Sequence, residues 1–356
     1  MAEVRETNIR VEQTLRSRLP EVDVKNLSFG KVFTDHMFQA DYAGESWTDL
    51  QILPYGPVEF DPAIMSLHYG QTIFEGMKAF RTVKDEVVLF RPHANLERLN
   101  VSAERMCMPR TTEEVFMDGL MRLVDMDRAW IPSLNGYSLY IRPYMYATDQ
   151  FLGVRPSENY RFSIICSPAG AYYSKPLRVK IETHYTRSAR GGIGFAKAGG
   201  NYGLSLLPTK MAQQEGFDQI IWTDALRHEF IEEAGTANLM FVLRGALITP
   251  PVKDTILRGI TRDSVLTLAR SWGLDVQERE ISVHEIVEAM ESGSLAEAFA
   301  VGTAATVTHI SEIGYQGKVY TLPDVTRREI SPRILQTLND IRYGKAEDQF
   351  GWLVKV

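Results

Sequence analysis

Residues 191–203 read GGIGFAKAGGNYG and place six glycines around Lys197. Each glycine loses conformational entropy on folding and adds no side chain to a core. So much freedom around one lysine predicts backbone that bends sharply or passes close to another group. A flexible surface loop is the simple interpretation, and a loop wrapped around a cofactor is the specific one.

The two common nucleotide-binding motifs do not match this loop. In a GxxxxGK[ST] motif the second glycine is followed by lysine, but here GFAKAG is followed by Gly200 and Asn201. GxGxxG fails as well, because Lys197 occupies the place of the third glycine. A lysine between glycines suits a nucleophilic amine that needs room for a flat partner, since a buried, neutral amine can form a Schiff base. An ordinary solvated lysine remains the alternative.

Three further segments suggest a partner for that amine. EFIEEAGTANLMFV at 229–242 sets an acidic pair before an apolar strand, and LRGITRDSV at 257–265 sets Gly-Ile-Thr before a helix, where amides can bind phosphate. AVGTAATV at 300–307 lets backbone amides approach a ligand. Singly, these are equally a charged turn, an ordinary helix cap and tight packing. Together they supply what pyridoxal phosphate requires: an amine, an acid for its ring nitrogen and donors for its phosphate.

Helical and strand-like segments alternate along the 356 residues, which predicts an α/β fold. We expect helices at 94–106, 112–128, 204–216 and 261–272, and strands at 161–168, 177–183, 218–224, 238–244 and 297–303. PAGAYYSKP at 168–176 is typical of a break. We therefore expect an α/β domain at 1–170, a linker at 171–177 and a second α/β domain at 178–356 that carries Lys197. A crevice between two domains is a common place for a small-molecule site.

Composition excludes several classes of protein. A net charge of −6 argues against nucleic acid, which calls for a basic face. Cys107 and Cys166 form no CxxC, so neither a disulfide framework nor a metal site is expected, and their apolar surroundings predict that both are buried. The N-terminus has no apolar signal segment, and no run is long enough to cross a bilayer, which predicts a cytoplasmic protein.

The same motifs resemble those of the branched-chain amino acid aminotransferases, of the fold-type-IV pyridoxal-phosphate class. The likeness extends over nearly the whole chain and keeps the family's order and spacing. It is carried by these segments: FGKVFTDHMF (29–38), HYGQTIFEGMKAF (68–80), LFRPHANLERLNVSAERMCMP (89–109), LYIRP (139–143), KAGGNYG (197–203), EEAGTANLMFV (232–242), LRGITR (257–262) and VGTAATV (301–307).

This resemblance implies roles for the residues around the cofactor, pyridoxal 5'-phosphate. Lys197 would be the catalytic residue, joined to the cofactor and moving the proton, with Glu233 on the ring nitrogen and Tyr202 on the ring oxygen. The other expected contacts are with the phosphate or the cofactor face, although Asn238 could serve only to hold its turn. They are Arg98, Thr236, Asn238, Gly259, Ile260, Thr261 and Thr303.

It also implies a substrate site that accepts both a branched side chain and a carboxylate. Tyrosines suit both, since they have an apolar ring and a polar tip, and Arg142 would bind the distal carboxylate of glutamate. The amides of Thr303 and Ala304 would bind the α-carboxylate. In the family some positions come from a partner subunit of a homodimer, here Tyr69 and Val154. The remaining expected contacts are Phe29, Phe74, Gly76, Tyr140 and Tyr172.

The implied function is transfer of the amino group of leucine, isoleucine or valine to 2-oxoglutarate by a ping-pong mechanism, as in branched-chain amino acid biosynthesis. Two alternatives share the fold: a D-amino acid aminotransferase and an aminodeoxychorismate lyase. A third is a two-domain binding protein in which the glycines serve only packing. The segments around Phe29, Tyr69 and Tyr140 favour the branched-chain enzyme.

Overall fold

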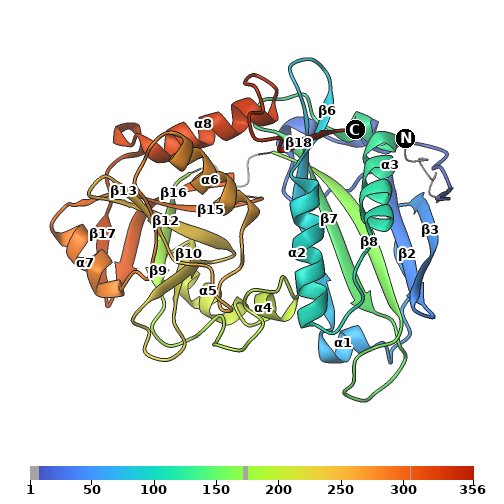
Figure 1. Cartoon of the computed structure of the whole chain (residues 1–356), viewed down its shortest axis with the longest axis horizontal. Coiled ribbons are helices and arrows are strands. Elements are labelled where there is room, and N and C mark those ends of the chain that lie inside the picture. The colour runs from blue at the N-terminus through green and yellow to red at the C-terminus, as the bar shows by residue number, and fades with distance from the viewer. Residues whose placement is uncertain (1–7, 171–174, 305) are drawn as a thin grey trace. The chain divides into compact units, whose positions relative to one another are not determined.

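The chain folds into two compact units, each built on its own sheet (Figure 1). The computed structural model describes residues 8–170, 175–304 and 306–356. The first unit comprises Met1–Tyr172 together with Asp340–Val356, and the second is Tyr173–Asn339. Residues 340–356 therefore belong to the first unit, whereas the sequence placed them in the second. The reason is a short strand near the C-terminus, β18 (Leu353–Lys355), which pairs with β6 (Val87–Phe90).

The first unit contains a mixed sheet whose neighbours are mostly antiparallel. Within the described ranges it has nine strands, in the order β1-β3-β2-β8-β7-β5-β6-β18, with β4 beside β7. The bounds not yet given are Arg10–Val11 (β1), His36–Ala43 (β2), Ser46–Pro54 (β3), Thr72–Phe74 (β4), Met77–Arg81 (β5), Ser138–Ala147 (β7) and Tyr160–Ala169 (β8). The strand expected at 161–168 is β8, at the centre of this sheet.

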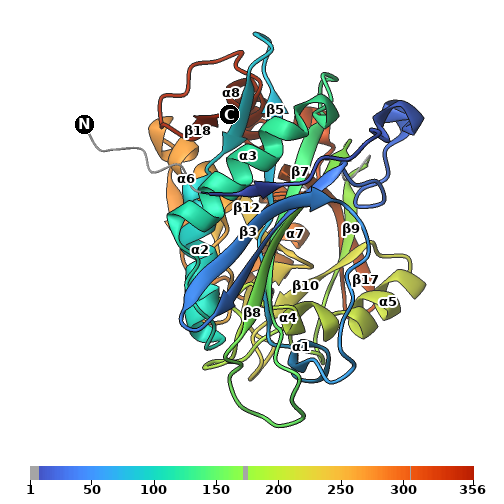
Figure 2. The same ribbon diagram turned by 90° about the vertical axis from the view of Figure 1, so that its right-hand side faces the viewer.

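Helices α2 (Pro92–Arg105) and α3 (Gly119–Met126) lie along this sheet (Figure 2). The apolar face predicted for 94–106 includes Leu99 and Ala103, and both are fully buried. The segment expected at 112–128 begins with a π-helical turn, Glu114–Asp118, and continues as α3. A short helix, α1 (Met65–Tyr69), precedes β4.

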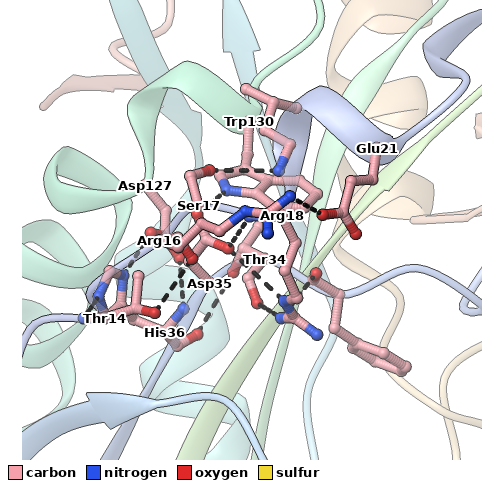
Figure 3. Close-up of polar contacts among 12 residues, drawn as sticks. Thr14, Arg16, Ser17, Arg18, Glu21, Thr34, Asp35, His36, Asp127 and Trp130 are labelled. Atoms are coloured by element: carbon pink, nitrogen blue, oxygen red, sulfur yellow. Dashed lines mark hydrogen bonds and ion pairs between the residues drawn. The ribbon is translucent and has the colours of Figure 1, made fainter.

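A polar network connects residues 14–18, near the N-terminus, to the rest of the first unit (Figure 3). Thr14 N–H donates to His36 Nε2 (3.0 Å), so the other ring nitrogen, Nδ1, carries the proton and donates to Asp127 (2.7 Å). Asp35 accepts from the Arg18 N–H (2.9 Å) and from Trp130 Nε1 (2.8 Å). These buried acceptors therefore hold residues 14–18, which lie outside any helix or strand.

We expect Asp35→Asn to reduce the free energy of unfolding by about 1–3 kcal/mol at neutral pH, because it weakens a buried acceptor. Burial alone would raise the pKa of Asp35, but the bonds from Arg18, Ser17 and Trp130 and the charge of Arg18 outweigh it and hold this pKa below its ordinary value. A carboxyl with a lowered folded-state pKa stabilises the fold above its unfolded-state pKa and loses that contribution as the pH falls. The difference in the free energy of unfolding between Asp35→Asn and the wild type should therefore become smaller as the pH falls.

Urea unfolding at several pH values measures this effect. Asp125→Asn is the control, since Asp125 forms an exposed pair with Arg128, and such pairs contribute little. Equal losses in the two variants would show that the buried network does not anchor the segment.

The second unit is a closed barrel. Its strands run in the order β11-β10-β9-β16-β15-β12-β13-β14, and an additional pairing between β11 and β12 closes the first six into a ring. The bounds are Leu177–Ile181 (β9), Gln219–Thr223 (β10), Ile231–Ala234 (β11), Ala237–Leu243 (β12), Ala246–Thr249 (β13), Val276–Glu278 (β14), Leu295–Gly302 (β15), Thr306–Tyr315 (β16) and Lys318–Thr321 (β17, beside β16). A closed barrel has no exposed edge among those six strands.

The strands expected at 177–183, 218–224, 238–244 and 297–303 are β9, β10, β12 and β15 of this barrel. Apolar side chains from several of its strands form one buried cluster that includes Val179, Leu239, Phe241 and Ile310. The helix expected at 261–272 is α6 (Ile260–Ser271), and 204–216 contains α5 (Leu206–Gln214). The other helices are α4 (Gly200–Gly203), α7 (Val283–Glu291) and α8 (Ile330–Arg342).

One prediction about the cysteines is wrong. Cys166 is buried on β8, but Cys107 is exposed. Cys107 lies in the turn that follows α2, with a backbone φ of 53°, and so stands outside the helix whose buried face includes Leu99 and Ala103. In the described ranges, each helix is too short or too polar to span a bilayer.

Candidate active site

Lys197 lies in the glycine-rich loop that precedes α4. Its Nζ donates to the Tyr202 hydroxyl (2.7 Å) and lies 5.2 Å from the centre of that ring. Asn201, between them in sequence, donates to the carbonyls of Ile193 and Ala196 (both 2.8 Å) and so folds the loop back on itself. The loop therefore presents a half-buried amine beside a phenol.

Glu233 lies on β11 and is 3% exposed. Asn238, opposite it on β12, donates from Nδ2 to Glu233 Oε1 (2.8 Å). The other carboxylate oxygen, Oε2, lies 2.8 Å from Nη1 of Arg187. Burial raises the pKa of Glu233 to about 7, while Arg187 opposes this and the neighbouring Glu232 adds to it. This carboxyl is thus poised to change its protonation near neutral pH, which is typical of functional sites.

Asn238 also brings the other predicted cofactor residues of the second unit together. Its Nδ2 donates to the carbonyl of Leu257 (2.9 Å), just before α6, and across the sheet it pairs with Val301 at the end of β15. The turn with Thr236, the turn with Thr303 and the start of α6 therefore lie around one asparagine. This side chain does more than hold its own turn.

Gly259 is required where it stands. A Cβ at this position would lie 1.9 Å from Asn238 Oδ1, far closer than any real contact. Ile260 and Thr261 follow as the first residues of α6, and Thr261 is buried. A helix start carries the positive end of the helix dipole, so the start of α6 is suited to bind an anion.

The remaining residues of this group occupy two turns. Thr303 and Ala304 form the half-buried turn between β15 and β16. Thr236 is exposed in the turn between β11 and β12, and together with Tyr202, Glu233 and Arg187 it lines a small pocket. The second unit thus gathers an amine, a phenol, a buried carboxyl and anion-binding backbone.

The first unit gathers a different set of predicted residues. Tyr140 on β7 is buried, and its ring lies 4.8 Å from Phe29, edge to face. Arg142 donates from Nη2 to the Tyr140 hydroxyl (2.9 Å), and its guanidinium lies 4.6 Å from the ring centre of Phe74. Its Nε is buried with no hydrogen-bond partner in the described part of the chain. The cluster therefore joins apolar rings to a cation that retains an unused donor.

Gly76 adjoins this cluster, since a Cβ there would lie 2.3 Å from the Tyr140 hydroxyl. The family resemblance assigns Arg142 to the distal carboxylate of a substrate. On that assignment we expect Gly76→Ala to displace this hydroxyl, and with it the Arg142 contact, and to raise the KM for a dicarboxylate about tenfold, the cost of one hydrogen bond to a charged group. Steady-state kinetics measures this, with Gly56→Ala as control because a Cβ at Gly56 meets nothing within 4 Å. Unchanged kinetics in Gly76→Ala would contradict the assignment.

Arg98 lies on α2 and forms a buried, bidentate pair with Glu75. Nε and Nη2 donate to the two carboxylate oxygens, both at 2.7 Å, and Asn95 donates to the same group (2.7 Å). Glu75 is completely buried. The resemblance assigned Arg98 to a phosphate but did not identify this carboxylate, which orients one edge of the guanidinium and leaves the Nη1 edge directed away from it.

Tyr69 and Val154 lie at the surface, unlike the buried Tyr140. Tyr69 ends α1 and is 41% exposed, while Val154 is 87% exposed. Backbone bonds from Met65 to Asp149 and from Phe151 to Ala63 hold α1 and the loop with Val154 side by side. Tyr172 lies outside the described residues.

Three buried charged side chains beside the candidate site were given no role of their own by the sequence analysis: Glu75, Arg187 and Glu232. Glu75 and Glu232 both stand inside quoted motifs, so a charged residue within an otherwise apolar motif was the available signal. Arg187 had none, because its partners are brought to it only by folding.

Comparison with known proteins identifies the family. Residues 72–313 match the family Amino-transferase class IV. Branched-chain-amino-acid aminotransferase 2 of Bacillus subtilis (strain 168) is 44% identical over 352 residues, which are 98% of this chain and 97% of that relative. The chain belongs to the branched-chain-amino-acid aminotransferases of class IV. The resemblance drawn from the motifs is confirmed, as is the mixed α/β fold.

Solved structures of branched-chain aminotransferases share this fold. The enzyme from Thermoproteus uzoniensis with norvaline has a TM-score of 0.74 and 27% identity, covering 89% of this chain and 99% of that one. The enzyme from Thermobaculum terrenum in its PLP form has a TM-score of 0.72 and 23% identity, covering 90% and 98%.

The residues of the second unit fit the cofactor of this family. Lys197 supplies an amine for the aldehyde, and Glu233 is a buried acid held by two partners. The start of α6 and the turn at Thr303 supply donors suited to a phosphate. The close approach of Gly259 to Asn238 makes this donor set compact.

Proposed function

We propose that this protein is a branched-chain L-amino acid transaminase that uses pyridoxal 5'-phosphate and passes the amino group of leucine, isoleucine or valine to 2-oxoglutarate. The observation that carries the proposal is the arrangement in the second unit, where a lysine bonded to a tyrosine stands with a buried, paired glutamate and a helix start gathered around Asn238. A packing role alone does not explain a buried carboxyl at this place.

Each group around the amine has a separate task. When bound, pyridoxal phosphate supplies a ring that takes up electrons from the substrate. Lys197 would hold the cofactor through its aldehyde carbon, with release of water, and once displaced by the substrate amine it would carry the proton from the substrate Cα to that carbon. Tyr202 orients the amine through its hydrogen bond and would donate to the ring oxygen. Glu233 would accept the N–H of the ring and so keep the ring positively charged.

The phosphate is assigned to backbone and hydroxyl donors at the start of α6 and in the neighbouring turn. The family resemblance assigns it also to Arg98 of the first unit, whose guanidinium is a planar cation. Glu75 fixes the orientation of that cation. The residues given this role are Arg98, Gly259, Ile260, Thr261 and Thr303, while Thr236 and Asn238 adjoin the cofactor face.

The substrate is assigned to the rings and the arginine of the first unit. Phe29, Phe74 and Tyr140 offer apolar surface to a branched side chain. Arg142 donates hydrogen bonds to the distal carboxylate of 2-oxoglutarate. Its buried Nε lacks a partner within the described residues. The turn amides of Thr303 and Ala304 bind the α-carboxylate that both substrates share.

A substrate panel tests this proposal. Purified protein is incubated with 2-oxoglutarate and, separately, L-leucine, L-isoleucine, L-valine or D-alanine, and glutamate formation is followed. We expect turnover with the three L-amino acids and none above background with D-alanine. The relatives described above are named for branched-chain amino acids, and the D-amino acid alternative has no comparable support. Turnover with D-alanine alone would reverse the assignment.

We further propose that the protein acts in the cytoplasm as a homodimer in which Tyr69 and Val154 serve the partner's site. Leu67 on α1 and Leu152 in the adjoining loop are both 66% exposed and accompany them. A surface rich in such side chains is typical of an interface.

If so, Val154→Asp should shift the equilibrium toward the monomer, because it sets a charge in an apolar contact. Sedimentation equilibrium measures the change, and Val83→Asp, also at an exposed valine, is the control. A wild-type protein of monomer mass at high concentration would rule out the dimer.

A further inference from the structure

Arg187 occupies a buried position behind the candidate cofactor acid. Its side chain is 9% exposed, and Nη1 lies 2.8 Å from Glu233 Oε2. Nη1 also donates to the carbonyl of Thr255 (2.8 Å), and Nη2 donates to that of Gly194 (3.1 Å). One guanidinium therefore connects β11, the glycine-rich loop and the segment before α6.

These partners leave the guanidinium little freedom. Gly194 and Thr255 approach so closely that a Cβ on Gly194 would lie 2.6 Å from the Thr255 carbonyl oxygen. Both acceptors belong to this tightly packed backbone, so the planar fork of Arg187 is held in one orientation. Since Asn238 holds the other oxygen of Glu233, the carboxylate is fixed from both sides.

A second carboxyl lies beside the pair. Glu232 is 7% exposed, and its Oε1 accepts from the Thr255 hydroxyl (2.6 Å). Its Oε2 is buried without a hydrogen-bond partner in the part of the chain that the structure describes. Burial raises the pKa of Glu232 and of Glu233, and the charge of Arg187 lowers both. Arg187 is therefore the cation with the largest effect on both acids. Lys197 also lowers the pKa of Glu233, while Lys253 lowers and Asp224 raises that of Glu232.

We infer that Arg187 is a positioning residue for transamination, which holds Glu233 in place and in its ionised form so that this carboxylate can accept the N–H of the cofactor ring. The inference rests on the proposed function, in which Glu233 serves the ring nitrogen. Arg187 acts through Glu233 and needs no contact with substrate.

The experiment compares Arg187→Gln with the wild type. Glutamine keeps one donor for the carbonyls of Gly194 and Thr255 but removes the charge. Arg187→Lys restores the charge without the fork, and Arg190→Gln is the control, since Arg190 is exposed three residues further along. Pyridoxal phosphate is titrated onto each apoprotein between pH 5.5 and pH 9. This range extends about 1.5 pH units or more on either side of the pKa of Glu233, which is about 7. Borohydride reduction followed by mass spectrometry then measures the lysine adduct.

In the wild type, affinity should fall as the pH drops below about 7, where Glu233 gains its proton. Without the cation this proton is held more tightly, so in Arg187→Gln the fall should begin at least about one pH unit higher, with a dissociation constant about tenfold larger at neutral pH. The kcat should decrease and the KM for L-leucine should change little. Arg187→Lys should recover most of the pH profile, and Arg190→Gln should match the wild type.

The outcomes separate the two proposals. A wild type without a lysine adduct would overturn the proposed function, whatever the variants do. A wild type with the adduct and an Arg187→Gln variant with the same pH profile would overturn the role of Arg187 alone. If Arg187→Gln does not fold, Arg187→Lys is the deciding variant. A wild-type pH profile of cofactor binding in Arg187→Lys supports the role of the positive charge, and a profile shifted to higher pH contradicts it.

Discussion

Replacing Lys197 by alanine is expected to reduce transamination of L-leucine by about 10⁴-fold or more. In the proposed function this amine moves the proton, and loss of a positioned acid or base alone costs about 10²–10⁴-fold. The variant also loses the nucleophile, so covalent attachment is lost in addition. Because Nζ contacts the Tyr202 hydroxyl at the half-buried edge of the loop, truncation should leave the fold intact.

Two readouts check this result. Glutamate formation measures turnover, and borohydride reduction with pyridoxal phosphate should add the cofactor mass to Lys197 in the wild type and not in the variant. Lys210→Ala, at an exposed lysine on α5, is the control and should behave as the wild type. Turnover or adduct formation at wild-type level in Lys197→Ala would end the proposal that this amine carries the cofactor.

The second large effect is expected for Glu233→Gln, which should lower kcat about 10²–10³-fold, the scale seen when one preorganised electrostatic partner is removed. Glutamine keeps the shape and can still accept from Asn238, but it cannot balance a positive ring. It also leaves Arg187 buried without its carboxylate. The KM for L-leucine should change little, because the proposed substrate contacts are made by other residues.

Glu232→Gln is a closely matched control, being the next residue and nearly as buried. Its side chain contacts Thr255, so we expect a loss of less than about tenfold, in keeping with one buried hydrogen bond. Equal losses of kcat in Glu232→Gln and Glu233→Gln would show that removing either buried acid has the same effect, and that no specific interaction of Glu233 is responsible. Measuring both with saturating L-leucine separates kcat from binding.

Local pattern predicted four of the helices and five of the strands. The helix at 261–272 and the strands at 177–183 and 238–244 were found within a few residues, because burial of one face imposes a period on the sequence. The strands β2, β7 and β16 were not predicted although they have eight to ten residues. Two further strands that were missed are short: β1 has two residues and β18 has three. Such strands exist only through their partners, so no period marks them, and the C-terminal residues 340–356 were assigned to the wrong unit for that reason.

The same distinction holds for the candidate site: some of its residues stand in sequence motifs, and others are brought together only by folding. Lys197, Tyr202, Glu233 and the start of α6 stand in motifs, and the motifs pointed to pyridoxal phosphate before any fold was considered. The resemblance supplied the role of Arg98 but could not reveal the pair with Glu75, because 23 residues separate them. The exposure of Cys107 was likewise missed, since it depends on how the chain turns after α2.

The sequence by itself determined the family and indicated the alternation of helices and strands, the candidate amine and the candidate acid, because each of these is written in residues close together in the chain. Only the tertiary structure decided that six strands close into a barrel, that Asn238 gathers the turns around the acid and that Arg187 lies behind Glu233. These contacts join residues tens of positions apart, and their energy depends on distance and burial, which folding alone creates.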